Sequence, residues 1–551
     1  MAVLTDKTYF NRESAEISST PFGIYVNQAG YGTENTKVAA IPFECSEFEI
    51  TDGEKIVYSG KTESRGYDKN SGDNLWTADF SDFKKQGRYR VKAGGKTSAE
   101  FEISDKVYKP VLRDVIRAFY FLRCGCGLDE KYAGVYNHAP CHNGQAVFWE
   151  DESVRADVSG GWHDAGDYGR YVTAGACAVA HILYAYRMFP IIKEMKMNIP
   201  ESGRDIPDIL SECHWELEWI MKMQREDGGV YHKVTTALHA PFVMPEDDKE
   251  QLYLFAVSSM AVADTAAVCA LAAGIYAGYD KEFSDRLRAA AELSYKWLEN
   301  NPDFVPFKNP EGCNTGGYGE WEDRSNRCWA AVELYILTGE EKYHKDFKKL
   351  LVHGFHRAGL GYGDVGGFAA LSYILYKGEK DEYIANGMLN DYIAEAKKLK
   401  NIADESGYRV AMTEENYHWG SNMDALKHGM VFAIVDYLTG KKEYSAYIDR
   451  IADYILGYNA LGISYITGTG EYRCNYPHLR PAHADGIEEC IPGMVSGGAN
   501  RTPNDPDAKA LIPEGTPPMK CFADDVGCYS LNEITIYWNS PAVFLFGYMC
   551  G

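Results

Sequence analysis

Two groups of carboxyl residues, far apart in the sequence, have the composition of a hydrolytic site. The first is the pair Asp164 and Asp167, in the run Gly160–Asp167. The second lies in the run Cys521–Glu533, which ends in Asn-Glu. A hydrolase that inverts a glycosidic centre needs one protonated carboxyl for the leaving oxygen and one carboxylate to activate water. We therefore predict that both groups serve one hydrolytic reaction.

Each group also has a structural alternative. Asp164 and Asp167 are spaced i, i+3 just before the apolar run that begins at Tyr171, where an Asp often caps a helix by accepting backbone N–H groups. Glu533 precedes the apolar C-terminal run, and Glu is common in a first helical turn. Glycines beside the first pair favour a tight turn instead. Apolar neighbours such as Tyr529 would raise the pKa of Glu533 and keep it protonated, as a general acid must be.

Cysteine and histidine residues gather around the first carboxyl pair. They are Cys124, the adjacent Cys141 and His142, and His163. Two thiolates and two imidazoles complete a tetrahedral zinc shell without a position for water, which predicts a structural zinc site. Cys126 is a competing ligand, and a buried thiol is the structural alternative for Cys124. A catalytic metal is a further alternative, in which chelation would stop turnover at once. We expect no organic cofactor.

Composition limits the partners of the chain. Its 551 residues carry a formal charge of -23, which repels phosphate backbones and anionic membranes, so we expect neither nucleic acid nor a membrane as a partner. Aromatic residues make up 13% of the chain and offer faces that pack on sugar rings, although most aromatics fill cores. The 14 cysteines are too sparse for a disulfide scaffold, and we expect most of them to be reduced.

The sequence pattern changes near residue 105. Short β-like runs punctuated by Gly, Asp and Ser predict a small β-sandwich over residues 20–104. From Tyr108 onward the apolar period is helical, which predicts one large α domain over residues 105–551. The strand-like runs are Gly23–Asn27, Lys37–Ile41, Phe48–Thr51, Lys55–Tyr58, Gly87–Lys92 and Ala99–Ile103. The helical runs include Val111–Cys124, Tyr171–Phe189, Ile206–Gln224, Val257–Ala277, Phe283–Leu298, Met423–Leu438 and Tyr444–Leu456.

Repeated helix junctions indicate a ring of helical hairpins. The runs Leu337–Gly339 and Leu438–Gly440 have the same sequence, Leu-Thr-Gly, and each is followed at the same offset by a Tyr. A Gly after a helix C-terminus ends that helix before the next begins. About twelve helical runs fit a toroid of six inner and six outer helices. The long loops Pro306–Asp323 and Ile463–Phe522 are then expected to line one rim.

Several of these blocks together resemble glycoside hydrolase family 9. The resemblance rests on Gly161–Asp167, Phe522–Ser540 and Ser464–Arg480, and it extends over nearly the whole chain. Phe22–Tyr31 is similar to the start of an immunoglobulin-like module found N-terminal in one subgroup. The resemblance implies a mainly α fold, in which an (α/α)6 barrel follows an immunoglobulin-like β-sandwich. Further similar blocks are Ile199–Asp208, Val230–Val234 and Tyr417–Asn422.

The resemblance also implies roles for individual residues. Asp167 would be the general base, Asp164 would help to hold the nucleophilic water, and Glu533 would be the general acid. Some family members hold a zinc with ligands in the order found here, and such a zinc would pin the turn that carries both aspartates. Four residues would bind sugar hydroxyls near the cleavage point or support that subsite: His478, Arg480, Asp524 and Tyr529. A turn-shaping role is the structural alternative for the histidine.

The chain departs from the family pattern in two places. At Tyr472 the pattern expects Asn, Lys or Arg. An acidic pair that often binds calcium in relatives is replaced here by Ser325 and Asn326, which leaves the oxygen ligands of Glu320 and Asp323. Calcium is therefore possible, and we do not predict it.

The resemblance implies β-1,4-glucans and their oligosaccharides as substrates, cleaved by endoglucanase or cellodextrinase action. The chain has no Pro/Thr/Ser-rich linker or added carbohydrate-binding module, which favours soluble β-glucan and cello-oligosaccharides. Two alternatives are an exo-acting glycosidase on a related β-1,4 oligosaccharide such as chitosan oligomers, and a non-catalytic glucan-binding protein. Because Met1–Phe10 contains no apolar h-region, we expect a cytoplasmic location, or an extracellular one if a signal peptide has been removed.

Overall fold

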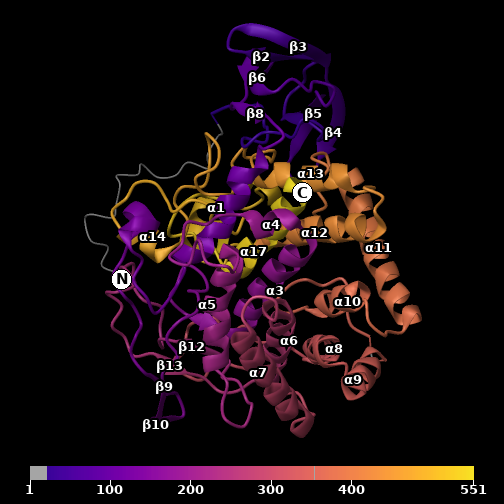
Figure 1. Ribbon diagram of the computed structural model, residues 1–551. Helices are drawn as coiled ribbons and strands as arrows, with labels where there is room; N and C mark the ends of the chain where they lie inside the picture. Colours follow the sequence, from indigo (N-terminus) through magenta and orange to yellow (C-terminus); the bar gives the residue numbers. More distant parts are fainter. Residues whose placement is uncertain (1–20, 353) are drawn as a thin grey trace. The chain divides into compact units, whose positions relative to one another are not determined.

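The computed structural model describes residues 21–352 and 354–551 (Figure 1). They form two compact units, one of residues 119–394 and one of residues 21–118 together with 395–551. The stretch Met1–Phe10, on which the expected location rests, lies outside the described residues, as does residue 20, where the predicted β-sandwich begins. The predicted boundary between residues 104 and 105 stays a prediction.

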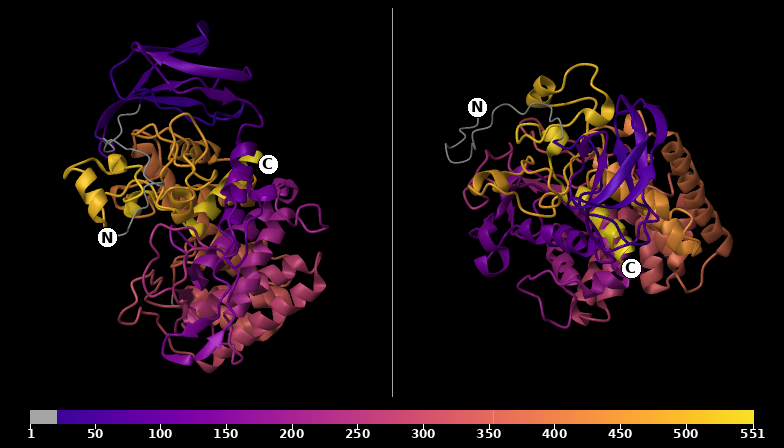
Figure 2. Two further views of the ribbon diagram at one scale, coloured as in Figure 1. Left: turned by 90° about the vertical axis from the view of Figure 1, so that its left-hand side faces the viewer. Right: turned by 90° about the horizontal axis from the view of Figure 1, so that it is seen from above.

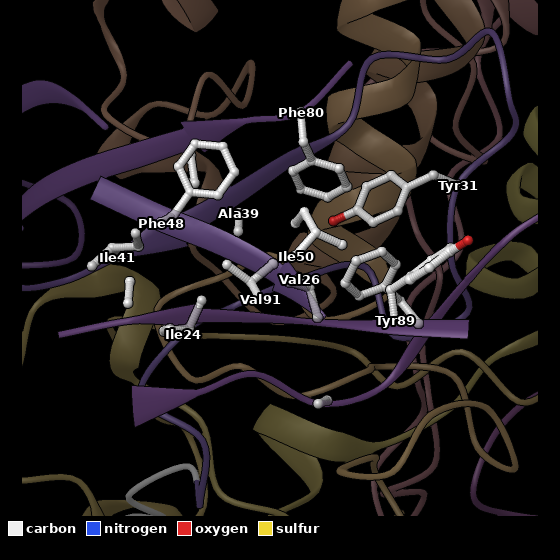
Figure 3. Packing of buried hydrophobic residues seen from close by; sticks show 14 of the residues in the cluster. Ile24, Val26, Tyr31, Ala39, Ile41, Phe48, Ile50, Phe80, Tyr89 and Val91 are labelled. Atoms are coloured by element: carbon white, nitrogen blue, oxygen red, sulfur yellow. The ribbon is translucent and has the colours of Figure 1, made fainter. Parts of the chain in front are cut away.

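Eight strands build the N-terminal β-sandwich, which is drawn in indigo in Figure 2. One sheet has the strand order β1-β5-β4, and the other has the order β3-β2-β6-β7 with β8 paired to β6. Figure 3 shows side chains such as Phe48, Phe80 and Val91 packed in the core between them. The strands are β1 (Val38–Ile41), β2 (Glu47–Asp52), β3 (Lys55–Lys61), β4 (Glu63–Asp68), β5 (Asp73–Asp79), β6 (Gly87–Ala93), β7 (Lys96–Thr97) and β8 (Phe101–Ile103).

Three strands of the sandwich were not predicted from the sequence: β4, β5 and the two-residue strand β7. β4 is an edge strand, and in it only Asp68 is buried, so it has no alternation of apolar and polar residues to detect. β5 is adjacent to β4 and was missed with it. In contrast, the run predicted as a strand over Gly23–Asn27 forms only one bridge, between Tyr25 and Ala40.

The sandwich contacts the loop that contains Tyr472 in its own unit. The side-chain amide of Gln28 donates to the carbonyls of Gly462 and Tyr472, both at 2.8 Å. The Tyr472 N–H in turn donates to Gln28 Oε1 at 2.7 Å. Asn27 Nδ2 donates to Asp453 Oδ1 at 2.7 Å beside this contact. The departure from the family pattern at residue 472 therefore falls where the backbone is held by Gln28.

The helices of residues 119–394 alternate between fully buried and amphipathic. α3, α6, α8 and α10 are buried along most of their length, whereas α5, α7 and α9 bury one face. α6 packs against α3, α7 and α8 (Figure 1). This alternation is what hairpins of inner and outer helices predict. The bounds are α3 (Val172–Met188), α5 (Asp208–Lys222), α6 (Ser259–Tyr276), α7 (Lys281–Asn300), α8 (Arg324–Thr338), α9 (Glu341–Leu351) and α10 (Gly366–Leu375).

One helix in the described part of the chain is long and apolar enough to cross a membrane. It is α6, with 18 residues, and 89% of this segment is buried inside the protein. Such burial is typical of a core helix in a large helical domain, because a helix that is apolar all round must be covered on every side.

The second unit contains the C-terminal helices. α12 (Ser421–Thr439) packs against α13 (Ser445–Ile455) and α17 (Ile536–Cys550). α1 (Tyr108–Phe121) and α11 (Glu382–Glu405) each have residues in both units. The predicted junctions are confirmed, since α8 ends at Gly339 and α12 ends at Gly440, both left-handed at φ 72° and 67°.

A five-stranded sheet in residues 119–394 was not predicted from the sequence. Its order is β10-β9-β13-β12-β11. The strands are too short for a periodic signal: β9 (Ala146–Phe148), β10 (Asp151–Ala156), β11 (Arg170–Tyr171), β12 (Lys233–Thr235) and β13 (Tyr253–Leu254). The pairing of β11 with β12 sets Tyr171 opposite Lys233. This sheet therefore joins the segment after the aspartate pair to the block Val230–Val234.

Candidate active site and metal site

The aspartate pair lies in a tight turn that precedes α3. The Asp164 N–H donates to the carbonyl of Gly169 at 2.9 Å, and the Gly169 N–H donates to Asp167 Oδ2 at 3.0 Å. α3 begins at Val172, and its N-cap is Tyr171 without a side-chain cap. Neither aspartate caps this helix, so the capping alternative for the pair is wrong.

Asp164 is buried, and only one of its two carboxyl oxygens accepts a hydrogen bond from the described residues. It is 1% exposed, and the Tyr318 hydroxyl donates to its Oδ2 at 2.5 Å. Within the described residues its Oδ1 has no hydrogen-bond partner. Burial, and then the charge of Asp167, hold the pKa of Asp164 well above its usual range, while the Tyr318 hydrogen bond lowers it. A buried polar oxygen without a protein partner is a binding point for an ordered water.

Asp167 is buried in the same turn and has polar groups close to its carboxyl oxygens. Its side chain is 6% exposed. The Tyr171 hydroxyl donates to Asp167 Oδ2 at 3.4 Å, and His239 Nδ1 lies 3.4 Å from the same oxygen. A carboxylate held at the surface of a buried turn beside a water-binding oxygen is suited to accept a proton from that water.

Two buried glutamates of α5 hold the turn by accepting hydrogen bonds from Trp162. Glu216 Oε2 accepts the Trp162 N–H at 2.6 Å, and Glu212 Oε1 accepts the Trp162 indole N–H at 2.9 Å. Gly161 has φ 76°, and a Cβ there would lie 2.7 Å from Trp219 Cγ. The Gly-Gly-Trp sequence is therefore required by a left-handed backbone packed directly against an indole.

The predicted metal ligands come together. One ligand atom from each of Cys124, Cys141, His142 and His163 lies within 4.8 Å of the others. His163 Nε2 is 3.4 Å from His142 Nδ1 and 3.9 Å from Cys141 Sγ. Ligand atoms around tetrahedral zinc are about 3.4–3.8 Å apart, and these two distances are close to that range. Asp248 Oδ2 lies 3.3 Å from His142 Nε2 and orients that ring, as carboxylates do behind metal-bound imidazoles.

The candidate metal group is joined directly to the turn that carries the two aspartates. His163 precedes Asp164 in the chain, and the Cys124 N–H donates to the Gly161 carbonyl at 2.7 Å. Among the described residues the competing ligand Cys126 is not part of the four-residue group, and burial raises the pKa of its thiol to about 12. A metal here would cross-link three segments that meet at the turn.

Glu533 lies in the second unit, between two helices. It follows α16 (Tyr529–Asn532), and its carbonyl accepts the Gly497 N–H at 2.8 Å. The N-cap of α17 is Thr535, whose side chain accepts the Trp538 N–H. Glu533 does not cap α17, so the capping alternative is wrong here as well. The carboxyl is half-buried.

His478 and Tyr529 lie beside Glu533. The backbone of His478 forms a bridge with Glu533, and its ring Nδ1 is 2.6 Å from the Val526 carbonyl. The His478 ring meets the Tyr529 ring edge-on, with 5.7 Å between centroids. Trp419, 40% exposed, contacts the other side of this group with its ring 5.3 Å from Tyr529. Polar groups and aromatic faces therefore surround the glutamate.

Asp524 holds the segment that leads to His478, and Arg480 follows that histidine by two residues. Asp524 accepts the N–H groups of Asn475 and Tyr476 at 2.8 and 2.9 Å, and the Cys474 thiol at 3.2 Å. Arg480 is the first residue of the short helix α14 (Arg480–Ala484) and is 6% exposed. Asp524 thus shapes the loop before His478, and its role at a sugar subsite stays a prediction.

Comparison with known proteins decides the family. The family model described as Glycosyl hydrolase family 9 matches residues 108–546, and the model described as Cellulase N-terminal ig-like domain matches residues 20–98. The chain belongs to glycosyl hydrolase family 9. A cellodextrinase from Butyrivibrio fibrisolvens is 45% identical over 539 residues, which cover 95% of this chain and 98% of that protein.

Solved structures of family 9 enzymes confirm the predicted fold class. A variant of a thermostable endoglucanase from Alicyclobacillus acidocaldarius has a TM-score of 0.90 and 32% identity, covering 96% of this chain and all of that one. The fold is the (α/α)6 barrel of the family with an immunoglobulin-like module before it. The chain is a glycoside hydrolase, so the alternative of a non-catalytic glucan-binding protein is set aside.

A second family 9 structure bears on the metal site. It is the endoglucanase J30 in a form described as a zinc-binding triple mutant, with a TM-score of 0.88 and 31% identity, covering 94% of this chain and 99% of that one. Zinc binding is a property of that protein. For this chain, the grouped cysteines and histidines constitute a candidate metal site.

The block considered for calcium contacts a carboxyl of α6, Asp264, that the sequence did not single out. Asn326 Nδ2 donates to Asp264 Oδ1 at 2.9 Å. Burial raises the pKa of Asp264 to about 8 and that of Glu320 to about 9, and in each case a neighbouring carboxylate adds to the effect. Ser325 and Asn326 bring no charge to this group, which therefore has a smaller negative charge than the family pattern would give.

Three residues around the aspartates were missed by sequence reasoning: Tyr171, His239 and Tyr318. Tyr318 does have a local signal, since it lies in a Gly-rich run and has φ 46°, a left-handed value that is uncommon outside glycine. His239 has no such signal, because its contact with Asp167 depends on the folded path of the loop after β12.

Proposed function

We propose that this family 9 enzyme hydrolyses β-1,4-glucosidic bonds in soluble β-glucan and cello-oligosaccharides with inversion. Asp167 is the general base, Asp164 helps to hold the water, and Glu533 is the general acid. The observation that carries the proposal is the pair of aspartates, where a buried Asp164 oxygen without a partner among the described residues stands beside the Asp167 carboxylate. The similarity to a cellodextrinase supports the substrate class.

The proposed reaction is a single displacement. Asp167 takes a proton from water, and the water oxygen attacks the anomeric carbon. The bond from that carbon to the glycosidic oxygen breaks, and Glu533 gives its proton to the departing oxygen. Inverting enzymes keep the two carboxyls roughly 6.5–9.5 Å apart, which leaves room for the water. His478 and Arg480 bind sugar hydroxyls in this proposal, because an imidazole and a guanidinium offer directional hydrogen bonds.

Trp321 is a candidate sugar platform near the aspartates. Its side chain is 97% exposed, and it follows Tyr318 by three residues. We expect Trp321→Ala to raise KM for cellotetraose about tenfold with little change in kcat, as for the loss of one aromatic contact. Tyr383→Ala, which removes another exposed ring of the same unit, is the control. An unchanged KM for Trp321→Ala would contradict this subsite.

We further propose that the metal site holds structural zinc on Cys124, Cys141, His142 and His163. When bound, zinc links these side chains and keeps the turn rigid. Chelation is expected to lower the thermal unfolding temperature first and to reduce activity only as the protein unfolds. Cys141→Ser should lose the metal in elemental analysis, whereas the control Cys126→Ser should keep it. Immediate loss of turnover in chelator, with the fold intact, would instead assign a catalytic metal.

Products formed from cellohexaose test the proposed substrate class. Purified enzyme is incubated with cellohexaose and, in parallel, with carboxymethylcellulose, and product lengths and viscosity are followed from the start. Cleavage of cellohexaose supports the proposal. Mixed mid-length products with a rapid fall in viscosity indicate an endoglucanase, and one short product at constant viscosity indicates a cellodextrinase. Absence of cleavage, together with cleavage of chitosan oligomers, would favour the alternative substrate.

A further inference from the structure

We propose that Lys233 is a positioning residue for the aspartate pair: it anchors the loop that presents Tyr318 to Asp164 and places a buried positive charge on the Asp167 side of the turn. This inference rests on the proposed function, in which Asp167 is the general base. Lys233 lies in the block Val230–Val234, to which the proposed reaction assigns no role.

Lys233 is a buried cation whose contacts are to neutral oxygens. It is 0% exposed, and its Nζ donates to Asn309 Oδ1 at 2.8 Å, Thr315 Oγ1 at 2.8 Å and the Gly316 carbonyl at 2.7 Å. Cys313 Sγ is 3.5 Å away. Burial lowers the pKa of Lys233 to about 8, which the nearby Cys313 and Asp167 oppose. Within the described residues no carboxylate contacts the ammonium group. Its burial therefore lowers the stability of the fold relative to an apolar residue at this position.

Aromatic rings form the other walls around the ammonium group. Nζ lies 4.5 Å from the centre of the Phe255 ring and 5.6 Å from the centres of the Tyr171 and Phe307 rings. The β11–β12 pairing fixes Tyr171 directly opposite Lys233. Cations are stabilised over aromatic faces, so this cage holds a charge in a fixed place.

The first route to the active site is through the loop. Two of the oxygens that Lys233 binds belong to Thr315 and Gly316, just before Tyr318. His232, the neighbour of Lys233 on the chain, contacts the Gly317 carbonyl through Nε2 at 2.8 Å. The Tyr318 hydroxyl at the end of this anchored segment donates to Asp164. Release of the anchor would therefore displace the hydroxyl that orients the water-holding carboxylate.

The second route is electrostatic. The groups that face Asp167 include Asp164, Tyr171 and His239. The Lys233 ammonium group lies 5.6 Å from the centre of the Tyr171 ring, and the charges of Lys233 and Asp167 attract each other. A positive charge there offsets Asp164 and keeps Asp167 ionised at lower pH.

Three variants test this inference. Lys233→Gln removes the charge but keeps amide donors in the cage, and Lys233→Met removes both. Thr315→Val keeps the charge and removes one anchor. We expect kcat on cellotetraose to fall about tenfold or more in both Lys233 variants and less in Thr315→Val. The acid limb of the kcat/KM profile should move up by about one pH unit in the Lys233 variants alone.

The control and the wild-type enzyme separate the possible outcomes. Lys380→Met removes a lysine that donates to the carbonyls of Ile374 and Tyr376 in the same unit, and it should change neither kcat nor the acid limb. A fall in kcat with an unmoved acid limb in Lys233→Gln would assign a structural role only and overturn the inference. Unchanged kcat in Thr315→Val would overturn the loop anchor even if both Lys233 variants fail to fold. If wild type itself does not cleave cellotetraose, the proposed function fails instead.

Discussion

Glu533→Gln is expected to slow cellotetraose hydrolysis by about 10²–10⁴-fold while binding is retained. The amide has nearly the shape of the acid but has no proton to give to the leaving oxygen. The measurement is steady-state turnover by chromatography, together with the dissociation constant of cellotetraose by calorimetry. The same variant should recover much of its rate on 2,4-dinitrophenyl cellobioside, because that leaving group departs without protonation.

Glu514→Gln is the matched control for this experiment, since Glu514 is an exposed glutamate of the same unit. It should leave turnover and binding unchanged. Full activity of Glu533→Gln on cellotetraose would refute the acid role. An equal loss on both substrates would show that Glu533 acts otherwise than by protonating the leaving group.

Asp167→Asn is expected to slow hydrolysis by a similar factor, about 10²–10⁴-fold, on cellotetraose and on the dinitrophenyl substrate alike. The asparagine amide keeps an oxygen near the Gly169 N–H, but it cannot take a proton from water, and activation of water is needed whatever the leaving group. Rates on both substrates, compared with wild type, provide the measurement.

Asp247→Asn serves as the control for Asp167→Asn, because Asp247 is an exposed aspartate of the same unit. The contrast between the two carboxyl variants is the informative result, since recovery on the activated substrate distinguishes an acid from a base. If Asp167→Asn recovered on the dinitrophenyl substrate and Glu533→Gln did not, the proposed roles would be exchanged.

The helices were predictable from the sequence either as long apolar runs, as for α6, or from the helical period of their apolar residues, as for α13. The run Val257–Ala277 became α6, Ser259–Tyr276, and Tyr444–Leu456 became α13, Ser445–Ile455. A helix of this length repeats its apolar pattern several times, so its position is well determined. β4 shows the opposite case, because an exposed edge strand has no buried face and leaves no apolar alternation in the sequence.

The site residues were predictable where chemistry requires a local motif, and were missed where contacts come from distant segments. Cys141 and His142 are adjacent in the chain, and the structure places them with Cys124 and His163 as the sequence suggested. The sequence around Lys233 does not reveal its position, because the groups around its ammonium come from the pairing of two short strands and from a loop about eighty residues further on. Such tertiary contacts leave no periodic or compositional pattern.

The stereochemistry of the first product tests the central claim most directly. Wild-type enzyme is added to cellotetraose in buffered D₂O, and proton NMR spectra are recorded within the first minutes, before the sugar anomers equilibrate. A single displacement by water, with Asp167 as base and Glu533 as acid, releases the new reducing end as the α anomer, which then converts slowly to the equilibrium mixture. Initial accumulation of the β anomer would contradict the account, because it requires a covalent intermediate and a different role for the carboxyls.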